Sequence, residues 1–342
     1  MPRMTGRVLV ATMADRDDHD TGAWHPERAA RLPAVDAGLA VPELAERITK
    51  LEPRQATTDE MARAHDRSHL DRIEAIAAEG GGAIDADTQT SAGSWETARW
   101  ASGAGLAAIE ALDADAGDLA FVSVRPPGHH ATRDQAMGFC LVNNIAVAAS
   151  TLANRGERVA VIDWDVHHGN GTQDIFWNDD RVFFASTHEH PAYPGSGRAT
   201  EMGGPAARGL TLNVPLPSGS GGDAAVIAFD QLIGPEIETF QPSWILISAG
   251  FDAHQADPLA NLRWTAGDYA ALATRVASLV PPRRTIAFLE GGYDLEALQH
   301  SVTASIGALA GLDLSSEPAS NGYDNASIVG RAIEARRRAI DS

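Results

Sequence analysis

The stretch Arg158-Val-Ala-Val-Ile-Asp-Trp-Asp-Val-His-His-Gly-Asn170 passes from apolar residues directly into acids and imidazoles. Its apolar half is typical of a strand buried on both faces of a parallel sheet. Side chains alternate along an extended chain, so Asp163, Asp165 and His167 share one face. Carboxylates and an imidazole crowded at a strand end repel each other or are poorly solvated unless a cation lies among them. This segment therefore predicts a metal site at the end of a buried strand.

The same alternation of strands and helices continues along the chain. Short β-rich runs predict strands at 7–12, 119–124, 158–163, 181–186, 210–214, 244–248 and 285–289. Helical spacing of small and apolar residues predicts helices at 97–112, 140–154, 224–240, 266–279 and 295–310, and a terminal helix marked by Ile328, Val329, Ala332 and Ile333. This order indicates an α/β fold with a mainly parallel central sheet covered by helices on both faces.

Composition limits the class of protein. The chain has 342 residues, of which 44% are hydrophobic, and lacks a linker-like segment, so we expect a single domain over residues 1–342. A formal net charge of −19 argues against a nucleic-acid partner and favours cationic substrates. The one cysteine, Cys140, fits a reducing cytoplasm. No run approaches the roughly 18 apolar residues of a membrane span, so no membrane partner is expected.

A second expected strand delivers another carboxylate to the same edge of the sheet. Asp252 follows the apolar run 244–248, and with Asp165 and His167 it makes a set of three ligands. A lone strand-end Asp more often caps a helix, but the Asp-x-Asp-x-His spacing reverses that preference. Three protein ligands leave an open position, as in catalytic sites, and mixed nitrogen and oxygen ligands suit Zn²⁺, with Fe²⁺ as the alternative.

Two further strand ends carry groups suited to proton transfer and oxyanion binding. His129 and His130 follow the expected strand 119–124 in a loop containing two prolines and a glycine, and adjacent histidines there suit proton transfer or metal binding. Tyr293 follows two glycines after the strand 285–289, and a tyrosine hydroxyl can donate to a developing oxyanion. Taken singly, a histidine or tyrosine in such a place is more often structural.

Taken together, the motifs resemble the histone deacetylase and acetylpolyamine amidohydrolase family over nearly the whole chain, and most of all its class II-like, bacterial members. The segments that carry the resemblance are Arg-Pro-Pro-Gly-His-His-Ala (125–131), Met-Gly-Phe-Cys-Leu-Val-Asn-Asn (137–144), Asp-Trp-Asp-Val-His-His-Gly-Asn-Gly-Thr-Gln (163–173), Ser-Ala-Gly-Phe-Asp (248–252) and Glu-Gly-Gly-Tyr (290–293). The resemblance implies a three-layer arginase-like fold and a deacetylase that releases acetate from N-acetyl amides.

The resemblance also implies a role for each matching residue. Asp165, His167 and Asp252 would hold zinc, and His130 would act as the general base and then as the proton donor. His129 would act electrostatically, oriented by Asp163. Asn170 would partner His130 where class I members carry an aspartate. That neutral partner would leave His130 less biased towards its charged form. Tyr293 would donate to the oxyanion.

Further sites follow from the same resemblance. A potassium ion would bind at Asp163, Asp165, His167, Ser186 and Thr187, and an outer one near Phe176, Asp179 and Val182. The substrate channel would be walled by Phe139, which follows Gly138, and by Tyr193. Leu259 stands where polyamine-selective relatives carry a glutamate. An apolar residue there favours acetyl-lysine or small acetylated amines as substrates, while the negative net charge keeps an acetylated polyamine open.

Two other functions remain open at this stage. A binuclear arginase-type hydrolase would use a second carboxylate two residues after Asp252, where this chain has His254, so this interpretation is disfavoured. A catalytically silent module that binds acylated ligands is the alternative from another class, although every expected catalytic position is filled. The sequence also leaves open a homo-oligomer.

Overall fold

A parallel sheet forms the centre of the computed structural model, which describes residues 6–13, 16–322 and 325–340. Its strand order is β2-β1-β5-β10-β9-β6-β7-β8, with parallel pairing throughout. The strands are β1 (Val8–Thr12), β2 (Ile48–Leu51), β5 (Leu119–Ser123), β6 (Val159–Asp163), β7 (Val182–Glu189), β8 (Thr211–Leu216), β9 (Trp244–Ala249) and β10 (Thr285–Leu289). A small antiparallel pair, β3 (Gly81–Ala83) with β4 (Gln89–Ser91), lies apart from this sheet.

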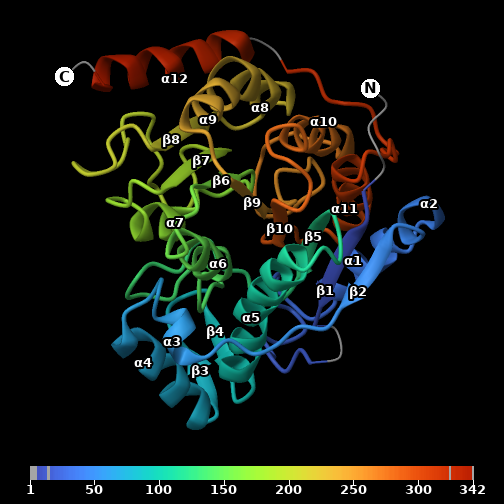
Figure 1. Ribbon diagram of the computed structural model, residues 1–342, viewed down its shortest axis with the longest axis vertical. Helices are drawn as coiled ribbons and strands as arrows, with labels where there is room; N and C mark the ends of the chain where they lie inside the picture. The colour runs from blue at the N-terminus through green and yellow to red at the C-terminus, as the bar shows by residue number, and fades with distance from the viewer. Residues whose placement is uncertain (1–5, 14–15, 323–324, 341–342) are drawn as a thin grey trace.

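Helices cover both faces of the sheet (Figure 1). One apolar core includes residues of α1 (Arg31–Leu39), α2 (Pro42–Ala45), α8 (Asp223–Ala228), η1 (Phe229–Ile233), α9 (Gly234–Phe240), α10 (Ala266–Val276), α11 (Leu295–Leu309) and α12 (Asn325–Ile340). The other core includes residues of α3 (Thr58–Met61), α4 (Arg67–Ala78), α5 (Ser94–Asp113), α6 (Asn144–Ala153) and α7 (Asn170–Ile175). The three-layer α/β fold expected from the sequence is confirmed.

The central strands are buried along their whole length and consist mainly of apolar residues, because both faces of the sheet are covered. Every residue of β5, β6, β9 and β10 is buried, which is why continuous apolar runs rather than alternating ones mark them in the sequence. In the terminal helix α12, Val329 and Ala332 are buried, as its apolar spacing predicts. Among the residues that the structure describes, no helix is long and apolar enough to cross a bilayer.

The differences from the expected elements have local causes. The helix expected over 224–240 is divided into α8, a π-helical turn η1 and α9, with Pro235 near the start of α9. The strand β2 was not expected from the sequence, because it is a short edge strand with no fully buried residue. Also not expected were β3, β4 and the helices α1 to α4 and α7, several of which are too short for a periodic pattern to show.

Candidate active site

Four adjacent strands end at the candidate site. Because β5, β10, β9 and β6 are neighbours and parallel, the loops after them lie at the same edge of the sheet. The residues carried by these loops are His129 and His130 after β5, Tyr293 after β10, Asp252 after β9, and Asp165 and His167 after β6. The structure therefore brings together the polar residues that the sequence places at separate strand ends.

Asp165, His167 and Asp252 form a group that could hold a metal ion. One ligand atom from each lies within 4.8 Å of the other two. His167 Nδ1 is 3.3 Å from Asp165 Oδ1 and 3.2 Å from Asp252 Oδ2. Both carboxylates are buried, and His167 is partly exposed. Two buried carboxylates that converge on one imidazole fit a divalent cation, because the cation offsets their mutual repulsion.

Backbone amides fix the direction of both carboxylates. Asp165 Oδ2 accepts a hydrogen bond of 2.8 Å from Gly291 N, and Asp252 Oδ1 accepts one of 2.9 Å from Val166 N. A Cβ atom on Gly291 would lie 2.1 Å from Asp252 Oδ2, so the glycine is what allows the β10 loop to approach so closely. The loops after β6, β9 and β10 thus hold one another in place.

The two histidines have different partners and opposite electrostatic environments. His129 Nδ1 lies 3.0 Å from Asp163 Oδ2, and His130 Nδ1 lies 2.7 Å from Asn170 Oδ1. Burial alone would lower the pKa of His129, but the carboxylates of Asp165 and Asp163 outweigh burial and raise it to about 10. Burial, together with His129 and His167, holds the pKa of His130 well below its usual value. His130 is therefore the neutral partner and can accept a proton.

The protonation pattern of neutral His130 follows from its neighbour. The Asn170 side-chain oxygen is an acceptor, so His130 Nδ1 carries the hydrogen and donates it. The other ring nitrogen, Nε2, is then left with a free lone pair. That nitrogen is the one available as a general base.

A tight turn presents the aromatic side chain expected at the channel. Met137 and Cys140 exchange backbone hydrogen bonds of 3.1 and 2.9 Å, and the two residues between them, Gly138 and Phe139, have φ values of +54° and +67°. A Cβ atom on Gly138 would lie 2.5 Å from His130 Cδ2, so only glycine lets the turn pack on the histidine. Phe139 is a non-glycine residue in the left-handed region, a conformation that clusters at functional sites.

Aromatic rings surround the histidine pair. Tyr193 packs edge-on against His130 at 5.1 Å between ring centroids, and Phe139 packs edge-on against Tyr293 at 5.8 Å. Tyr193 and Leu259 are large hydrophobic residues that stay exposed, at 38% and 39%. Tyr193 and Phe139 therefore contact residues expected to act in the channel, and Tyr193 and Leu259 reach the surface.

Comparisons with known proteins agree with this geometry. The model of the histone deacetylase domain matches residues 25–309. A probable deacetylase of Archaeoglobus fulgidus is 40% identical over 304 residues, which cover 87% of this chain and 84% of the relative. A histone deacetylase-like amidohydrolase of Pseudomonas aeruginosa is 38% identical over 296 residues, covering 85% and 77%. The chain belongs to the histone deacetylase family.

The fold comparison leads to the same family. The crystal structure of the HDA15 HD domain superposes with a TM-score of 0.89 at 32% identity, covering 98% of this chain and 95% of that one. The family resemblance inferred from the motifs is thereby confirmed, and the chain is a hydrolytic deacetylase. The silent binding module considered from the sequence is accordingly not supported.

The structure shows a role for one buried acid, Glu290, for which the sequence analysis predicted none. Glu290 is fully buried, and its Oε2 accepts hydrogen bonds from Gly128 N at 2.7 Å and His129 N at 3.1 Å. Burial raises the pKa of Glu290 to about 7. Glu290 therefore ties the histidine loop after β5 to the tyrosine loop after β10. The signal in the sequence was an acid placed directly after a buried strand.

A buried arginine was also missed. Arg31, at the start of α1, donates to the carbonyl oxygen of Gly292 at 2.7 Å and to that of Glu290. Its guanidinium lies 5.1 Å from the centroid of the Tyr293 ring and pairs with Glu27, which also pairs with Arg125. This charge network thus holds the backbone of the loop that carries Tyr293. The separation of Arg31 from Tyr293 in sequence hid the contact.

The residues expected at the potassium site are adjacent. Asp163 and Ser186 are partners in the register of β6 with β7, and Ser186 and Thr187 are buried. Asp163 Oδ1 also accepts a hydrogen bond of 3.0 Å from Asp165 N. At the expected outer site, Asp179 forms an ion pair with Arg181. The structure thus places Asp163, Ser186 and Thr187 on neighbouring strands, with Asp163 in contact with the candidate metal ligand Asp165.

The geometry of His254 does not suit a second metal site. Its Nε2 lies 3.0 Å from Glu317 Oε2, and its Nδ1 accepts a hydrogen bond of 3.2 Å from Ala256 N. Both ring nitrogens are therefore engaged away from Asp252. The binuclear arrangement considered from the sequence has no geometric support at this residue.

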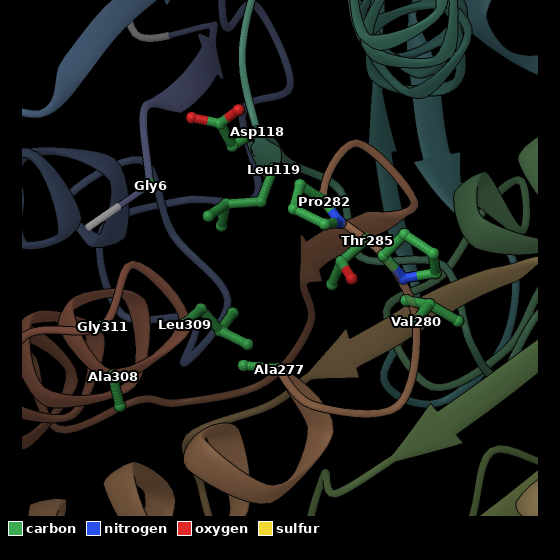
Figure 2. Close-up of a pocket in the computed structure, with 11 residues that line it drawn as sticks. Gly6, Asp118, Leu119, Ala277, Val280, Pro282, Thr285, Ala308, Leu309 and Gly311 are labelled. Carbon is green, nitrogen blue, oxygen red and sulfur yellow. The ribbon is translucent and has the colours of Figure 1, made fainter. Parts of the chain in front are cut away.

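A pocket of about 260 Å³ lies at the amino ends of the central strands, opposite the ends that carry the candidate active site. Figure 2 shows its lining, which includes Leu119 and Thr285 at the starts of β5 and β10, and Ala308 and Leu309 at the end of α11. These are the amino ends of the strands, whereas the histidine pair and the candidate metal ligands follow the carboxyl ends. This pocket is separate from the candidate active site.

Proposed function

We propose that this deacetylase is zinc-dependent and hydrolyses N-acetyl amides of primary amines to the free amine and acetate, within a single catalytic domain. The observation that carries the proposal is the convergence of Asp165, His167 and Asp252 beside the His129–His130 pair. These three ligands would hold Zn²⁺, with Fe²⁺ as the alternative metal. When bound, zinc would polarise the acetyl carbonyl and lower the pKa of the attacking water.

The side chains around that metal site divide the proton transfers between them. His130, neutral and with Nε2 free, takes the proton of the attacking water. The Tyr293 hydroxyl donates a hydrogen bond to the oxyanion that forms at the acetyl carbonyl oxygen when water adds to the carbonyl carbon. His130 then returns its proton to the departing amine. The acetyl C–N bond breaks to give the neutral amine and acetic acid, and the acid then loses its proton to the amine or to solvent and leaves as acetate.

His129 has a different role in this proposal. It is held by Asp163 and remains protonated more readily than His130, so it contributes positive charge rather than a proton. That charge lies 4.0 Å from His130, measured between ring centroids, and disfavours a proton on His130 at rest. The pair therefore keeps its base available.

A potassium ion is proposed beside the zinc. Its ligands would be oxygen atoms of Asp163, Asp165, His167, Ser186 and Thr187. The support is the pairing of Asp163 with Ser186 across β6 and β7, and the burial of Ser186 and Thr187. An oxygen-rich site of this kind suits a hard cation. We also propose the outer potassium site near Phe176, Asp179 and Val182.

The substrate is proposed to be acetyl-lysine in a peptide or a small acetylated amine. Phe139 and Tyr193 would enclose the aliphatic stem that carries the acetyl group, because both rings contact the catalytic residues. Leu259 is exposed and apolar, so it offers no partner for a distal ammonium. A cytoplasmic location and a homo-oligomer stay predictions.

An N-acetylated polyamine is the second candidate substrate. Burial, together with the negative charges of Asp87 and Asp85, raises the pKa of the Tyr193 hydroxyl above its usual value, so these carboxylates lie near the channel wall. They would attract a polycation. This observation favours a polyamine even though Leu259 disfavours one.

Steady-state kinetics with an acetyl-lysine peptide and an N-acetylated polyamine distinguish the two substrates. We expect a higher kcat/KM for the peptide. Leu259→Glu should shift the ratio towards the polyamine, and Leu259→Met should leave it nearly unchanged as the matched apolar control. A large preference of the wild-type enzyme for the polyamine would overturn the acetyl-lysine assignment.

A further inference from the structure

We infer that Asp257 is a positioning residue whose single carboxylate fixes both the residue at the channel mouth, Leu259, and the catalytic tyrosine, Tyr293. The inference rests on the proposed function, because it assigns Tyr293 a part in the reaction. It adds a physical link between the part of the channel that selects substrates and the group that stabilises the oxyanion.

The two oxygens of Asp257 serve two different loops. Oδ2 accepts hydrogen bonds from Tyr293 N at 2.7 Å and Asp294 N at 3.3 Å, in the loop after β10. Oδ1 accepts one of 3.0 Å from Leu259 N, in the loop after β9. Asp257 is only 7% exposed, so bulk water has little access to replace these bonds. The carboxylate therefore joins the two loops directly.

The tyrosine loop needs an external support of this kind. Gly292, immediately before Tyr293, has a φ of +117°, a backbone conformation that residues other than glycine rarely adopt. Because glycine has no side chain, it does little to restrict the backbone at this position. Glycine there makes space for Phe251 and Leu298, since a Cβ atom would lie 3.0 and 3.1 Å from their side chains. Backbone hydrogen bonds to Asp257 then hold the position from which the Tyr293 side chain extends.

The position of the Tyr293 hydroxyl depends on that backbone. The hydroxyl is at the far end of a long side chain, so a small rotation at Cα moves it substantially. The Tyr293 ring is bounded by Arg31 on one side and Phe139 on another, which limits its tilt. Arg31 also holds the carbonyl of Gly292, but the amide of Tyr293 itself is held by Asp257. A displacement of about 1 Å of a catalytic group can reduce turnover about a hundredfold.

The shared carboxylate gives the channel mouth an influence on turnover. A substrate that displaces Leu259 pulls on Asp257 Oδ1, and the same carboxylate holds Tyr293 through Oδ2. Discrimination at Leu259 is therefore expected in kcat as well as in KM. If Asp257 positions Tyr293, the effect of an Asp257 substitution on kcat should depend on whether the Tyr293 hydroxyl is present. A residue that only stabilises a loop would show no such dependence.

A double-mutant cycle between Asp257→Asn and Tyr293→Phe tests the inference. In the wild-type background, Asp257→Asn should lower kcat about tenfold or more while KM changes less. In the Tyr293→Phe background the same substitution should lower kcat less than about twofold, since the hydroxyl it positions is gone. An equal fold-change in both backgrounds would overturn the inference.

Asp268→Asn is the matched control. Asp268 is also buried and also joins two segments, with Oδ2 accepting from Thr265 N at 2.8 Å and Oδ1 from Ser320 N at 3.0 Å. Neither segment carries a residue of the proposed mechanism. Asp268→Asn should reduce the melting temperature and leave kcat within about twofold. A tenfold loss of kcat in this control would mean that loosening any loop has the same effect, which would contradict a specific role for Asp257.

Hydrogen exchange gives a readout that does not need turnover. Backbone amides of residues 290–294 should exchange faster in Asp257→Asn than in the wild-type protein, and at the wild-type rate in Asp268→Asn. Unchanged exchange in Asp257→Asn would overturn the inference even if the enzyme were active. If the wild-type protein hydrolysed no acetyl amide, the proposed function would fail, and the exchange comparison would still show whether Asp257 holds the tyrosine loop.

Discussion

His130 Nδ1 lies 2.7 Å from the side-chain oxygen of Asn170, so a neutral amide partners the proposed general base. Replacing that amide by a carboxylate in Asn170→Asp should raise the pKa of His130, because a negative neighbour favours the protonated ring. A base must be unprotonated to act, so the acid limb of kcat/KM should move to higher pH by about one unit or more. The measurement is the pH profile of kcat/KM.

Asn154→Asp provides the matched control for this change. Asn154 ends α6 at the end remote from Asn143 and accepts a hydrogen bond from Arg181, so the same new charge is placed away from the histidine pair. Its pH profile should match that of the wild-type enzyme. An acid limb that does not move in Asn170→Asp would show that the amide does not govern the basicity of His130.

Tyr293→Phe should lower kcat by a factor of about 10² to 10³, which corresponds to about 3 kcal/mol of lost oxyanion stabilisation. KM should change much less, because the hydroxyl acts mainly in the transition state. Tyr193→Phe removes a hydroxyl from the channel wall but keeps the ring, and it should retain most of the activity. Near-normal turnover by Tyr293→Phe would remove Tyr293 from the mechanism.

Glu290 is predicted to stabilise the histidine loop through its two backbone hydrogen bonds. Glu290→Ala leaves the buried amides of Gly128 and His129 without this acceptor and should cost about 2 to 5 kcal/mol of unfolding free energy. Glu290→Gln keeps an acceptor oxygen and should cost clearly less. Denaturant titration of both variants makes the comparison, and equal losses would show that the hydrogen bonds contribute little.

His65 is expected to make the fold sensitive to acid. Burial, with the neighbouring His69, lowers the pKa of His65 to about 3. The ring donates a hydrogen bond from Nδ1 to Thr132 O and accepts one at Nε2 from Asn143 N. An unfolded chain would bind a proton at His65 near pH 6.5, while the folded one stays neutral. The unfolding free energy should therefore fall as the pH drops below about 6.5, by about 2 kcal/mol from this residue at pH 5.

His65→Gln tests this assignment, because glutamine does not titrate. The variant should be less stable than the wild-type protein at pH 7, yet lose about 2 kcal/mol less between pH 7 and pH 5. The loss ends only where the folded form itself binds the proton, near pH 3. Identical pH dependence in the two proteins would exclude His65 as a source of acid sensitivity.

The features that could be predicted from the sequence are those with a local pattern. Continuous apolar runs mark the buried strands, and the polar residues right after them mark the edge where the site forms. Parallel pairing then brings Asp165 and Asp252 together although they belong to different strands. Those inferences needed only alternation and the rule for parallel sheets.

The residues that position the catalytic loops, Arg31, Asp257 and Glu290, could not be predicted in this way because their contacts join segments distant in the sequence. Arg31 lies in α1, while its partner carbonyl belongs to Gly292, and no local periodicity relates the two. Asp257 and Glu290 are acids whose roles depend on which backbone amides face them. Short elements such as β2 also escaped, since a half-exposed edge strand has no apolar run.

The most direct test of the account is hydrolysis of an acetyl-lysine peptide by metal-free protein, followed as zinc is added back. Activity should be lost on chelation and return in proportion to bound zinc, saturating at about one equivalent. His167→Ala should fail to recover activity over the same range of zinc concentration. His254→Ala should recover it, because the His254 ring hydrogen-bonds to Glu317 rather than to the metal site. Full activity in metal-free protein, or saturation near two equivalents, would contradict the single zinc centre at Asp165, His167 and Asp252.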